Sequence, residues 1–278
     1  MLSYRHSFHA GNHADVLKHL VLGRILAYLV RKDKPLCYLD THAGAGGYTL
    51  QGVQAQKNRE YETGIGRLWG RADLPVPLAE YLELVRRFNP GNELQYYPGS
   101  PWLARQLLRS TDRLFLHELH PADYAALREQ SAGDRRVKVV CVDGYQGCIA
   151  LVPPMERRGL VLIDPPFELK TDYRQAIETL HQAHKRFATG VYALWYPVVE
   201  RARVESMERA LRATGIPRVD RYELAIAPDR RGHGMTASGL LVVNPPWGLR
   251  AEMEACLPWL VRELAGAGGG CRVEALVD

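Results

Sequence analysis

Strand-length apolar runs alternate with helical stretches along this chain of 278 residues, and that alternation limits the fold more than any other feature. Parallel strands need a long crossover, which a helix usually supplies. We therefore expect an α/β fold: a parallel sheet with helices on both faces. The runs expected as strands are residues 36–40, 113–118, 137–143, 160–164, 191–196, 219–227 and 240–244.

The expected helices lie between most of these runs, at residues 12–32, 100–110, 121–130, 172–187 and 201–214. A sequence pattern typical of a helix start is clear at "SPWLARQ", where Ser100 is expected as the N-cap and Pro101 as the first helical residue. Residues 51–95 break the alternation and are too long for an ordinary loop. We read them as a small helical insertion within a single domain spanning residues 1–278.

Two similar phrases occur 80 residues apart: "GLVLIDPPF" (159–167) and "GLLVVNPPW" (239–247). The last two expected strands, 219–227 and 240–244, are joined by "PDRRGHGMTASG", which has little helical character. Such a connection predicts an antiparallel hairpin. The second phrase would then end at the opposite edge of the sheet from the first, with Trp247 packed on the scaffold and Asn244 dispensable for chemistry.

Glycines and acids follow three successive strands. "LCYLDTHAGAGG" places Gly44 and Gly46 after the first strand, Glu118 ends the second, and Asp143 with Gly144 ends the third. Ligands of open α/β sheets bind beyond the carboxyl ends of the strands, where glycines allow close approach of the backbone. Each feature alone fits a structural turn or a helix-capping acid. As an ordered set they favour a cofactor that contains adenosine.

The fourth strand ends in Asp164-Pro165-Pro166-Phe167. Prolines remove backbone donors, so the Pro165 carbonyl and the Asp164 carboxylate are expected as a pair of acceptors for an exocyclic –NH₂ group. Phe167 offers a face on which a heteroaromatic ring can stack. The alternative reading is a rigid turn at a strand end.

The order of glycine loop, Glu118, Asp143 and D-P-P-F resembles that of class I S-adenosylmethionine-dependent amino-methyltransferases. More narrowly, "MLSYRHSFHAGNHADVLKH", "YLDTHAGAGGY", "YYPGSP", "RRGLVLIDPPFELKTDY", "YALWYPV" and "GMTASG" resemble the RlmJ family over the whole chain. That resemblance implies a Rossmann-like sheet of seven strands and methylation of adenine N6 in large-subunit (23S) ribosomal RNA. The target base would have to leave its stack to reach the site.

The resemblance also implies roles for individual residues. The methionine end of the cofactor would contact His19 and His42, and Ser100 would help to hold the cofactor. Glu118 would bind its ribose, and Asp143 and Gly144 would bind its adenine. Asp164 would be the catalytic acceptor, and Tyr4 would meet the RNA or close the pocket. One departure is Phe167, at a position where related enzymes often have Tyr. Stacking survives that change.

Neither a metal site nor a disulfide framework is expected. His6, His9, His13 and His19 lack an H-E-x-x-H pattern, and the five cysteines form no C-x-x-C pair. No apolar run approaches the roughly 20 residues of a membrane span, and the N-terminus lacks the apolar region of a signal peptide. We expect a cytoplasmic protein, and a monomer because no oligomerisation signal is evident.

Other functions stay open on the residues alone. DNA adenine-N6 and protein glutamine-amide methyltransferases also act on –NH₂ groups at such a turn. A non-catalytic RNA-binding protein on the same fold is the rival from another class. The net charge of +5 suits an anionic partner such as RNA but is also ordinary for a soluble protein.

Overall fold

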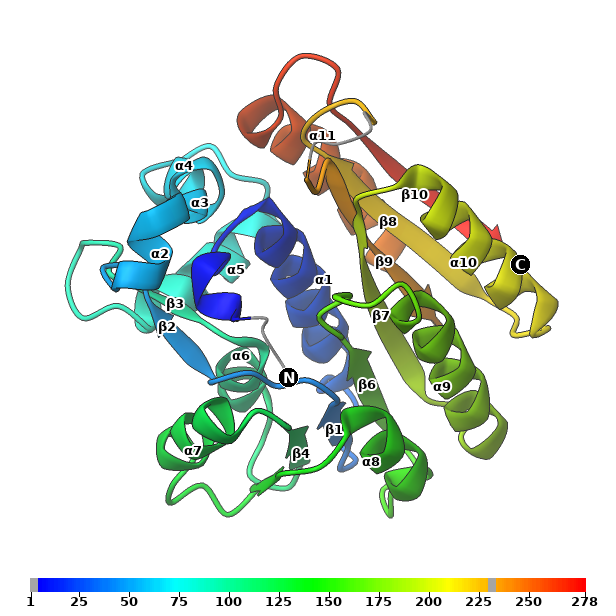
Figure 1. Ribbon diagram of the computed structural model, residues 1–278. Coiled ribbons are helices and arrows are strands. Elements are labelled where there is room, and N and C mark those ends of the chain that lie inside the picture. Colours follow the sequence, from blue (N-terminus) through cyan, green and yellow to red (C-terminus); the bar gives the residue numbers. More distant parts are fainter. Residues whose placement is uncertain (1–4, 230–233) are drawn as a thin grey trace.

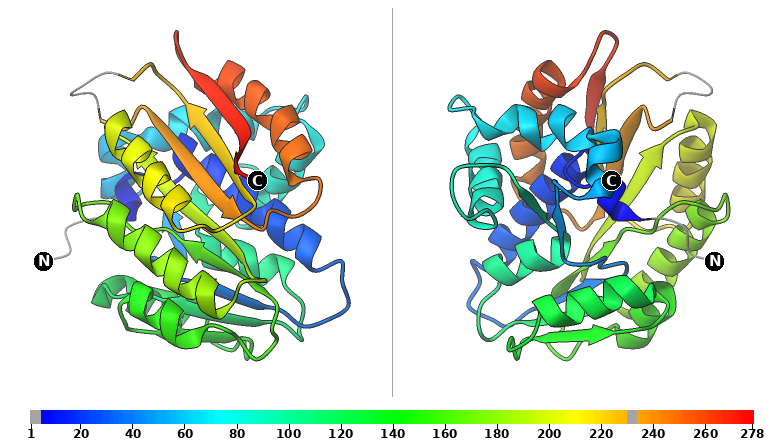
Figure 2. Two further views of the ribbon diagram at one scale, coloured as in Figure 1. Left: turned by 90° about the vertical axis from the view of Figure 1, so that its right-hand side faces the viewer. Right: turned by 60° about the vertical axis from the view of Figure 1, so that its left-hand side comes forward.

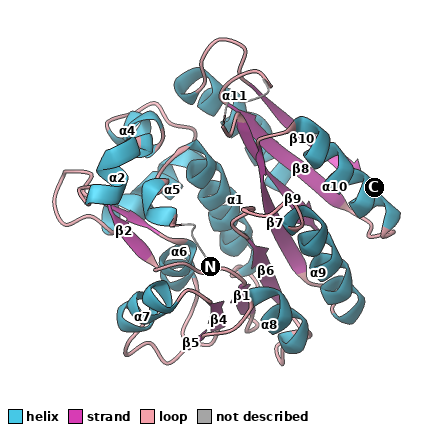
Figure 3. Ribbon diagram, viewed as in Figure 1, coloured by secondary structure: helices cyan, strands magenta, loops and turns pink. Residues whose placement is uncertain are grey.

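A twisted sheet with helices on both faces forms most of the computed structural model, which describes residues 5–229 and 234–278 (Figures 1 and 3). Tyr4 lies outside the described residues. The strands of the sheet, in spatial order, are β10 (Gly270–Val277), β8 (Val219–Ala225), β9 (Ala237–Val243), β7 (Val191–Val198), β6 (Gly159–Ile163), β1 (Cys37–Asp40), β4 (Arg113–His117) and β5 (Val137–Val140).

Strands β5, β4, β1, β6 and β7 pair in parallel, as the alternation predicts. Their carboxyl ends therefore share one edge of the sheet, which we call the carboxyl edge; the opposite edge is the amino edge. The expected number of seven strands is wrong by one. Strand β10 adds to the outside of β8, antiparallel to it. Its side chains are mostly exposed or half-buried, so it carries no apolar run that marks it in the sequence.

Alternate side chains of the strands enter two separate cores. In β6, Leu160 and Leu162 pack toward α1, α6 and α11, whereas Val161 and Ile163 pack toward α8, α9 and α10. Figure 2 shows α9 and α10 on one face of the sheet and α1 on the other. The helices of the two layers are α1 (His13–Leu29), α6 (Ser100–Leu107), α7 (Pro121–Gln130), α8 (Gly144–Leu151), α9 (Asp172–Arg186), α10 (Arg201–Ala213) and α11 (Leu249–Leu264).

Residues 51–95 carry four helices, which lie beside α1 and α11 (Figure 1). They are α2 (Val53–Asn58), α3 (Glu60–Thr63), α4 (Ile65–Trp69) and α5 (Val76–Arg87). The short antiparallel pair β2 (Gly47–Thr49) and β3 (Tyr96–Pro98) brings the two ends of this segment together. A 3₁₀ turn, η1 (His6–Phe8), precedes α1. The division into one domain with a helical insertion stays a prediction from the sequence. Among the described residues, no helix is both long and apolar enough to cross a membrane.

The hairpin prediction for the last two expected strands is confirmed. Strand β9 is antiparallel to both β8 and β7, so Asn244 emerges at the amino edge. There its amide bonds three neighbours: Nδ2 donates to the carbonyls of Ala188 and Gly190 at 2.8 and 2.7 Å, and Oδ1 accepts from Arg218 at 2.7 Å. Asn244 has φ +53°, a left-handed conformation that asparagine tolerates better than most residues.

The expected packing of Trp247 on the scaffold is wrong, because its side chain is 86% exposed. Pro245 and Pro246 fix the chain as it leaves β9, and Gly248 turns it with φ +87° into α11. The turn buries Pro246 and Leu249 on either side and leaves the indole between them in solvent.

Replacing Asn244 by alanine should lower the free energy of unfolding by about 1 kcal/mol, because the carbonyls of Ala188 and Gly190 lose their donor and alanine tolerates the positive φ less well. Turnover should remain, since the residue is at the far edge from the site described below. Asn244→Gly is the matched control: it loses the same bonds but accepts the positive φ, so it should lose less stability. Denaturant unfolding and methyl transfer measure the two effects. An Asn244→Ala protein that is folded but inactive would contradict this assignment.

Candidate active site

A cavity of about 400 Å³ opens at the carboxyl edge of the sheet, between the N-terminal segment, α1 and the loops that follow β1, β4 and β6. Nearly all of the described residues singled out by sequence line it: His19, His42, Gly44, Ser100, Glu118, Asp143, Gly144, Asp164, Pro165 and Phe167. Gly46 does not. Its φ of +86° and the bond from Gly99 N–H to its carbonyl, 2.9 Å, support the turn beneath the cavity instead.

Glu118 is fixed to the glycine loop by its own carboxylate. Oε2 accepts from Gly44 N–H at 2.8 Å and Oε1 accepts from His120 N–H at 2.6 Å. Gly44 has φ +63°, and a Cβ there would overlap the Tyr48 hydroxyl. Burial raises the pKa of Glu118, against the two backbone bonds, which lower it. Each oxygen keeps a lone pair for a further donor, as a ribose hydroxyl would supply.

Asp143 and Gly144 begin α8 three residues beyond the end of β5. Asp143 is the N-cap, and its Oδ1 accepts from Gln146 N–H at 3.1 Å. It is therefore a helix-capping acid and also a residue of the cavity wall. A Cβ on Gly144 would lie 1.7 Å from the Thr41 carbonyl, so only glycine allows α8 to approach the β1 loop this closely.

Ser100 is not the N-cap of α6, contrary to the prediction; Gly99 is. The physical reason is that the Ser100 hydroxyl donates to Asp40 Oδ2 at 2.7 Å rather than capping its own helix. Asp40 also accepts from the Tyr38 hydroxyl at 2.7 Å. Burial raises the pKa of Asp40 to about 6, although both of these bonds lower it. The Ser100 oxygen is thus left as an acceptor for a cationic group in the cavity.

His19 ends a buried relay of three side chains. Tyr81 of α5 bonds Tyr97 at 2.8 Å between hydroxyl oxygens, and the Tyr97 hydroxyl lies 2.8 Å from His19 Nδ1. Burial lowers the pKa of His19 to about 3, so its imidazole is neutral and carries one proton. If both hydroxyls donate toward His19, every proton of the relay has an acceptor. The His19 proton then sits on Nε2 and is available to an acceptor such as a carboxylate.

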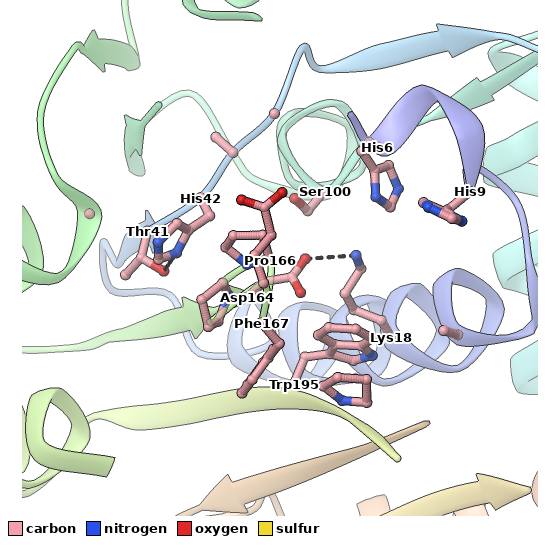
Figure 4. A pocket seen from close by; sticks show the side chains of 18 of the residues that line it. His6, His9, Lys18, Thr41, His42, Ser100, Asp164, Pro166, Phe167 and Trp195 are labelled. Atoms are coloured by element: carbon pink, nitrogen blue, oxygen red, sulfur yellow. Dashed lines mark hydrogen bonds and ion pairs between the residues drawn. The ribbon is translucent and has the colours of Figure 1, made fainter. Parts of the chain in front are cut away.

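Lys18 links the D-P-P-F turn to α1, and the sequence reasoning missed it. Its Nζ lies 2.7 Å from Asp164 Oδ2 (Figure 4). The same Nζ lies 3.0 Å from Asp15 Oδ1. Asp15 Oδ2 in turn accepts from Gly11 N–H at 2.9 Å and bonds His6 Nε2 at 2.8 Å. Burial opposes the charge of Lys18, but the two carboxylates outweigh it and hold the pKa of Lys18 well above its usual value.

Asp164 therefore presents one oxygen to the cavity. Lys18 takes Oδ2, and no hydrogen bond from the described residues reaches Oδ1. The carboxylate follows β6 directly, so its backbone is held by the sheet. An acceptor of this kind, fixed at the wall of a cavity, suits a donor –NH₂ group.

Two rings, those of Phe167 and Trp195, line the cavity next to Asp164, and Tyr173 packs behind Phe167. The Phe167 ring lies 4.6 Å from that of Tyr173 and 5.7 Å from that of Trp195, between centroids. Lys18 Nζ stands 5.7 Å over the Trp195 ring. Phe167 has φ +51°, a strained conformation for a bulky residue that the two prolines and the ring contacts maintain. Phe167 is thus partly a packing residue and partly a surface of the cavity.

His42 lies across the cavity from Lys18 (Figure 4). Its Nδ1 is 2.8 Å from the Thr41 hydroxyl, and its ring packs edge-on against Tyr145, 4.9 Å between centroids. Burial lowers the pKa of His42 to about 4, so it is neutral at physiological pH. The Tyr145 hydroxyl is buried and has no hydrogen-bond partner among the described residues.

Among residues 5–229 and 234–278, no group of three or more His, Cys, Asp or Glu side chains is arranged to hold a metal ion. In particular, His6 and His9 bond the carboxylates of Asp15 and Glu60, respectively.

Comparisons with known proteins point in one direction. The model of the family described as "Ribosomal RNA large subunit methyltransferase D, RlmJ" matches residues 33–277. A protein of Escherichia coli K12, "Ribosomal RNA large subunit methyltransferase J", is 54% identical over 270 residues, which cover 97% of this chain and 96% of that protein. Its namesake in Haemophilus influenzae is 52% identical over 271 residues, with the same coverage.

Solved structures agree on the fold. A crystal structure of a Legionella pneumophila protein superimposes with a TM-score of 0.90 at 40% identity, covering 96% of this chain and 98% of that one. A probable spermidine synthase of Corynebacterium glutamicum, with a TM-score of 0.53 at 13% identity, covers 95% of this chain and 75% of its own. The second likeness concerns the fold alone.

The relay predicts how Tyr97→Phe will behave. Without the hydroxyl, His19 loses its fixed tautomer, and affinity for S-adenosylmethionine should fall about threefold to tenfold, as for the loss of one hydrogen bond. Turnover at saturating cofactor should change little. Tyr81→Phe is the matched control, because the bond from Tyr97 to His19 survives it. Calorimetry measures both affinities, and equal values for Tyr97→Phe and the parent would exclude the relay.

Proposed function

This chain belongs to the RlmJ family of ribosomal RNA large subunit methyltransferases, and from that premise we infer that it methylates N6 of an adenine in 23S ribosomal RNA. The methyl donor is S-adenosylmethionine. The observation that carries the inference is that one cavity holds both the D-P-P-F turn and the residues expected to bind the cofactor. An isolated turn or an isolated glycine loop would support much less.

The residues of the cavity fit S-adenosylmethionine in their chemistry. Glu118 supplies acceptors for ribose hydroxyls, and Gly44 and Gly144 allow the backbone at the cavity wall to pack closely on Tyr48 and Thr41. Ser100 keeps an acceptor for an ammonium group, and His19 a donor for a carboxylate. The buried Tyr145 hydroxyl, which bonds none of the described residues, is a further donor toward a polar ligand. We assign the methionine end to the side of His19 and Ser100, and the adenine to that of Asp143.

When bound, this cofactor supplies an activated methyl group, whose bond to sulfur breaks as its bond to N6 forms. The adenine amine is a poor nucleophile because its lone pair is delocalised into the ring. Asp164 Oδ1 and the Pro165 carbonyl accept its two hydrogens, which favours a pyramidal, more reactive nitrogen. After transfer N6 carries one proton too many, and the Asp164 carboxylate takes it.

Lys18 holds this acceptor in place. Its bond to Oδ2 restricts the rotation of the Asp164 carboxylate and leaves Oδ1 for the amine. A preorganised acceptor costs no reorientation at the moment of reaction. Phe167 and Trp195 supply the ring faces for a base that has left its stack. Tyr4, outside the described residues, is assigned by family resemblance to the RNA or to closure of the pocket.

The proposal also covers the partner, the oligomeric state and the location of the enzyme. Ribosomal RNA is the macromolecular partner, the enzyme acts as a monomer without a metal ion, and it works in the cytoplasm. The net charge of +5 favours association with a polyanion.

The function is tested by incubating the protein with labelled S-adenosylmethionine and deproteinised 23S ribosomal RNA, followed by digestion and mass analysis of the nucleosides. Label should appear in N6-methyladenosine alone, and duplex DNA or protein offered in place of RNA should stay unlabelled. Label in any other nucleoside would refute the assignment.

Asp164→Ala is the variant that separates chemistry from binding in this assay. Turnover should fall by about 10²-fold or more, because the preorganised acceptor is gone. Affinity for S-adenosylmethionine should stay close to that of the parent, since Asp164 faces the amine more than the cofactor. A variant that turns over at a tenth of the parental rate would contradict the acceptor mechanism.

A further inference from the structure

Unpaired cations gather at the amino edge of the sheet, on the side away from the cavity. They lie in the segments that lead into β1, β6, β7 and β8, at Arg31, Lys32, Lys34, Arg157, Arg158, Lys185, Arg186 and Arg218. No carboxylate among the described residues forms an ion pair with them. The acids of the same edge are already engaged: Asp112 and Asp33 lie at Arg109, Glu156 at Arg113, and Asp220 at Arg250.

This distribution differs from that over the rest of the molecule, where many arginines have a carboxylate partner. Arg24, Arg71 and Arg201 are examples, each with two. The cations at the amino edge have other neighbours: Arg31 lies over the Tyr28 ring, Arg218 bonds the Asn244 amide, and the rest bond carbonyls or lie in solvent. Arg158 donates to the Lys34 carbonyl and Arg186 to that of Ile149. The edge thus keeps an excess of positive charge, and Asp278, after β10, adds an acid at its far end.

The cations form a row. Strands β8, β9, β7, β6 and β1 are neighbours in that order, and adjacent strands lie about 4.8 Å apart. Arg218 therefore begins a line that continues through Lys185 and Arg157 to Lys34, roughly 20 Å long. A row of this length can meet several phosphates of one nucleic acid strand.

Trp247 follows β9, which lies between β8 and β7, so it emerges at this edge between Arg218 and the segment before β7. The Asn244 side chain ties these parts together, since it bonds Arg218 on one side and the carbonyls of Ala188 and Gly190 on the other. The indole is 86% exposed, but the backbone that carries it is restricted, because two prolines precede Trp247 and the buried Leu249 follows it. A rigid, exposed aromatic ring loses little conformational entropy when a base stacks on it.

We propose that the amino edge, made of these cations and Trp247, is a second RNA-binding surface that holds the ribosomal RNA substrate at a place distant from the target adenine. The inference rests on the proposed function, because a large RNA can reach both edges of the sheet. RNA fits the surface better than a protein partner does, since the surroundings of Trp247 are cationic rather than apolar. Phosphates meet the row of cations, and an unstacked base meets the indole.

The test compares two edge variants with a matched control, using deproteinised 23S ribosomal RNA in filter-binding assays between 50 and 200 mM salt, a range over which phosphate contacts change affinity by about 10³-fold or more. One variant is Trp247→Ala, and the other combines Lys32→Gln, Arg157→Gln and Lys185→Gln. The control combines Arg67→Gln, Arg87→Gln and Arg262→Gln, which removes the same charge from exposed positions elsewhere. Circular dichroism and thermal unfolding verify that all remain folded.

Trp247→Ala should bind the RNA about tenfold more weakly, and Trp247→Phe should recover most of that loss. The triple edge variant should lower the slope of log affinity against log salt by about 2, whereas the control triple should leave it near the parental value. Turnover at saturating RNA should be unchanged in all of them. Edge variants that bind as the control does would overturn the proposal. If the parent binds the RNA but forms no N6-methyladenosine, the proposed function fails separately.

Discussion

The ammonium group of Lys18, buried between Asp15 and Asp164, is the interaction on which the site depends. It joins three parts of the chain: α1, which carries it; β6, which ends at Asp164; and the N-terminal segment, whose Gly11 and His6 bond Asp15. Removing one member of a buried ion pair costs about 3–5 kcal/mol, because a charge is then left without compensation. The acceptor of the proposed reaction is therefore held by a triad, Asp15, Lys18 and Asp164, in which the loss of one member leaves a buried charge uncompensated.

The helices of residues 51–95 support this arrangement from behind. Glu60 of α3 accepts from Asn12 Nδ2 at 3.0 Å and bonds His9 Nδ1 at 2.9 Å, so it holds the residues just before α1. Ile65 N–H donates to the Gly11 carbonyl at 2.9 Å. Tyr81 of α5 reaches the cavity through Tyr97 and His19, on the side proposed for the cofactor. Residues 51–95, whose function is not evident from the sequence, thus position both the residues just before α1 and His19.

Local sequence patterns are sufficient to predict the parallel strands and the acids at their ends. Glu118, Asp143 and Asp164 follow apolar runs, and the direction of parallel strands brings their ends together without any knowledge of side-chain packing. Helix α8 is too short for a clear period, and Pro258 within α11 breaks the pattern of a helix that tertiary packing nevertheless maintains. Both went unpredicted for that reason.

Contacts between distant residues were out of reach. Lys18 and Asp164 are 146 positions apart, and Tyr97 and His19 are 78 apart. The pair Asp15 and Lys18, three residues apart in a helix that is otherwise mostly apolar, was the one local signal available. Residue type alone predicts that Ser100 caps a helix and that Trp247 packs on the scaffold. In the fold, the Ser100 hydroxyl bonds Asp40, and a turn fixed by two prolines leaves the Trp247 indole in solvent.

A double-mutant cycle on methyl transfer, with Lys18→Met and Asp164→Asn, tests the dependence of Asp164 on Lys18 most directly. Each protein is first verified as folded by thermal unfolding, and rates are measured with labelled S-adenosylmethionine at saturating RNA. Lys18→Met should slow the parent by more than about tenfold, within the usual range for a lost positioning group, yet have almost no further effect once Asp164 is asparagine. Equal losses in both backgrounds would show that Lys18 acts independently of Asp164 and would contradict the account.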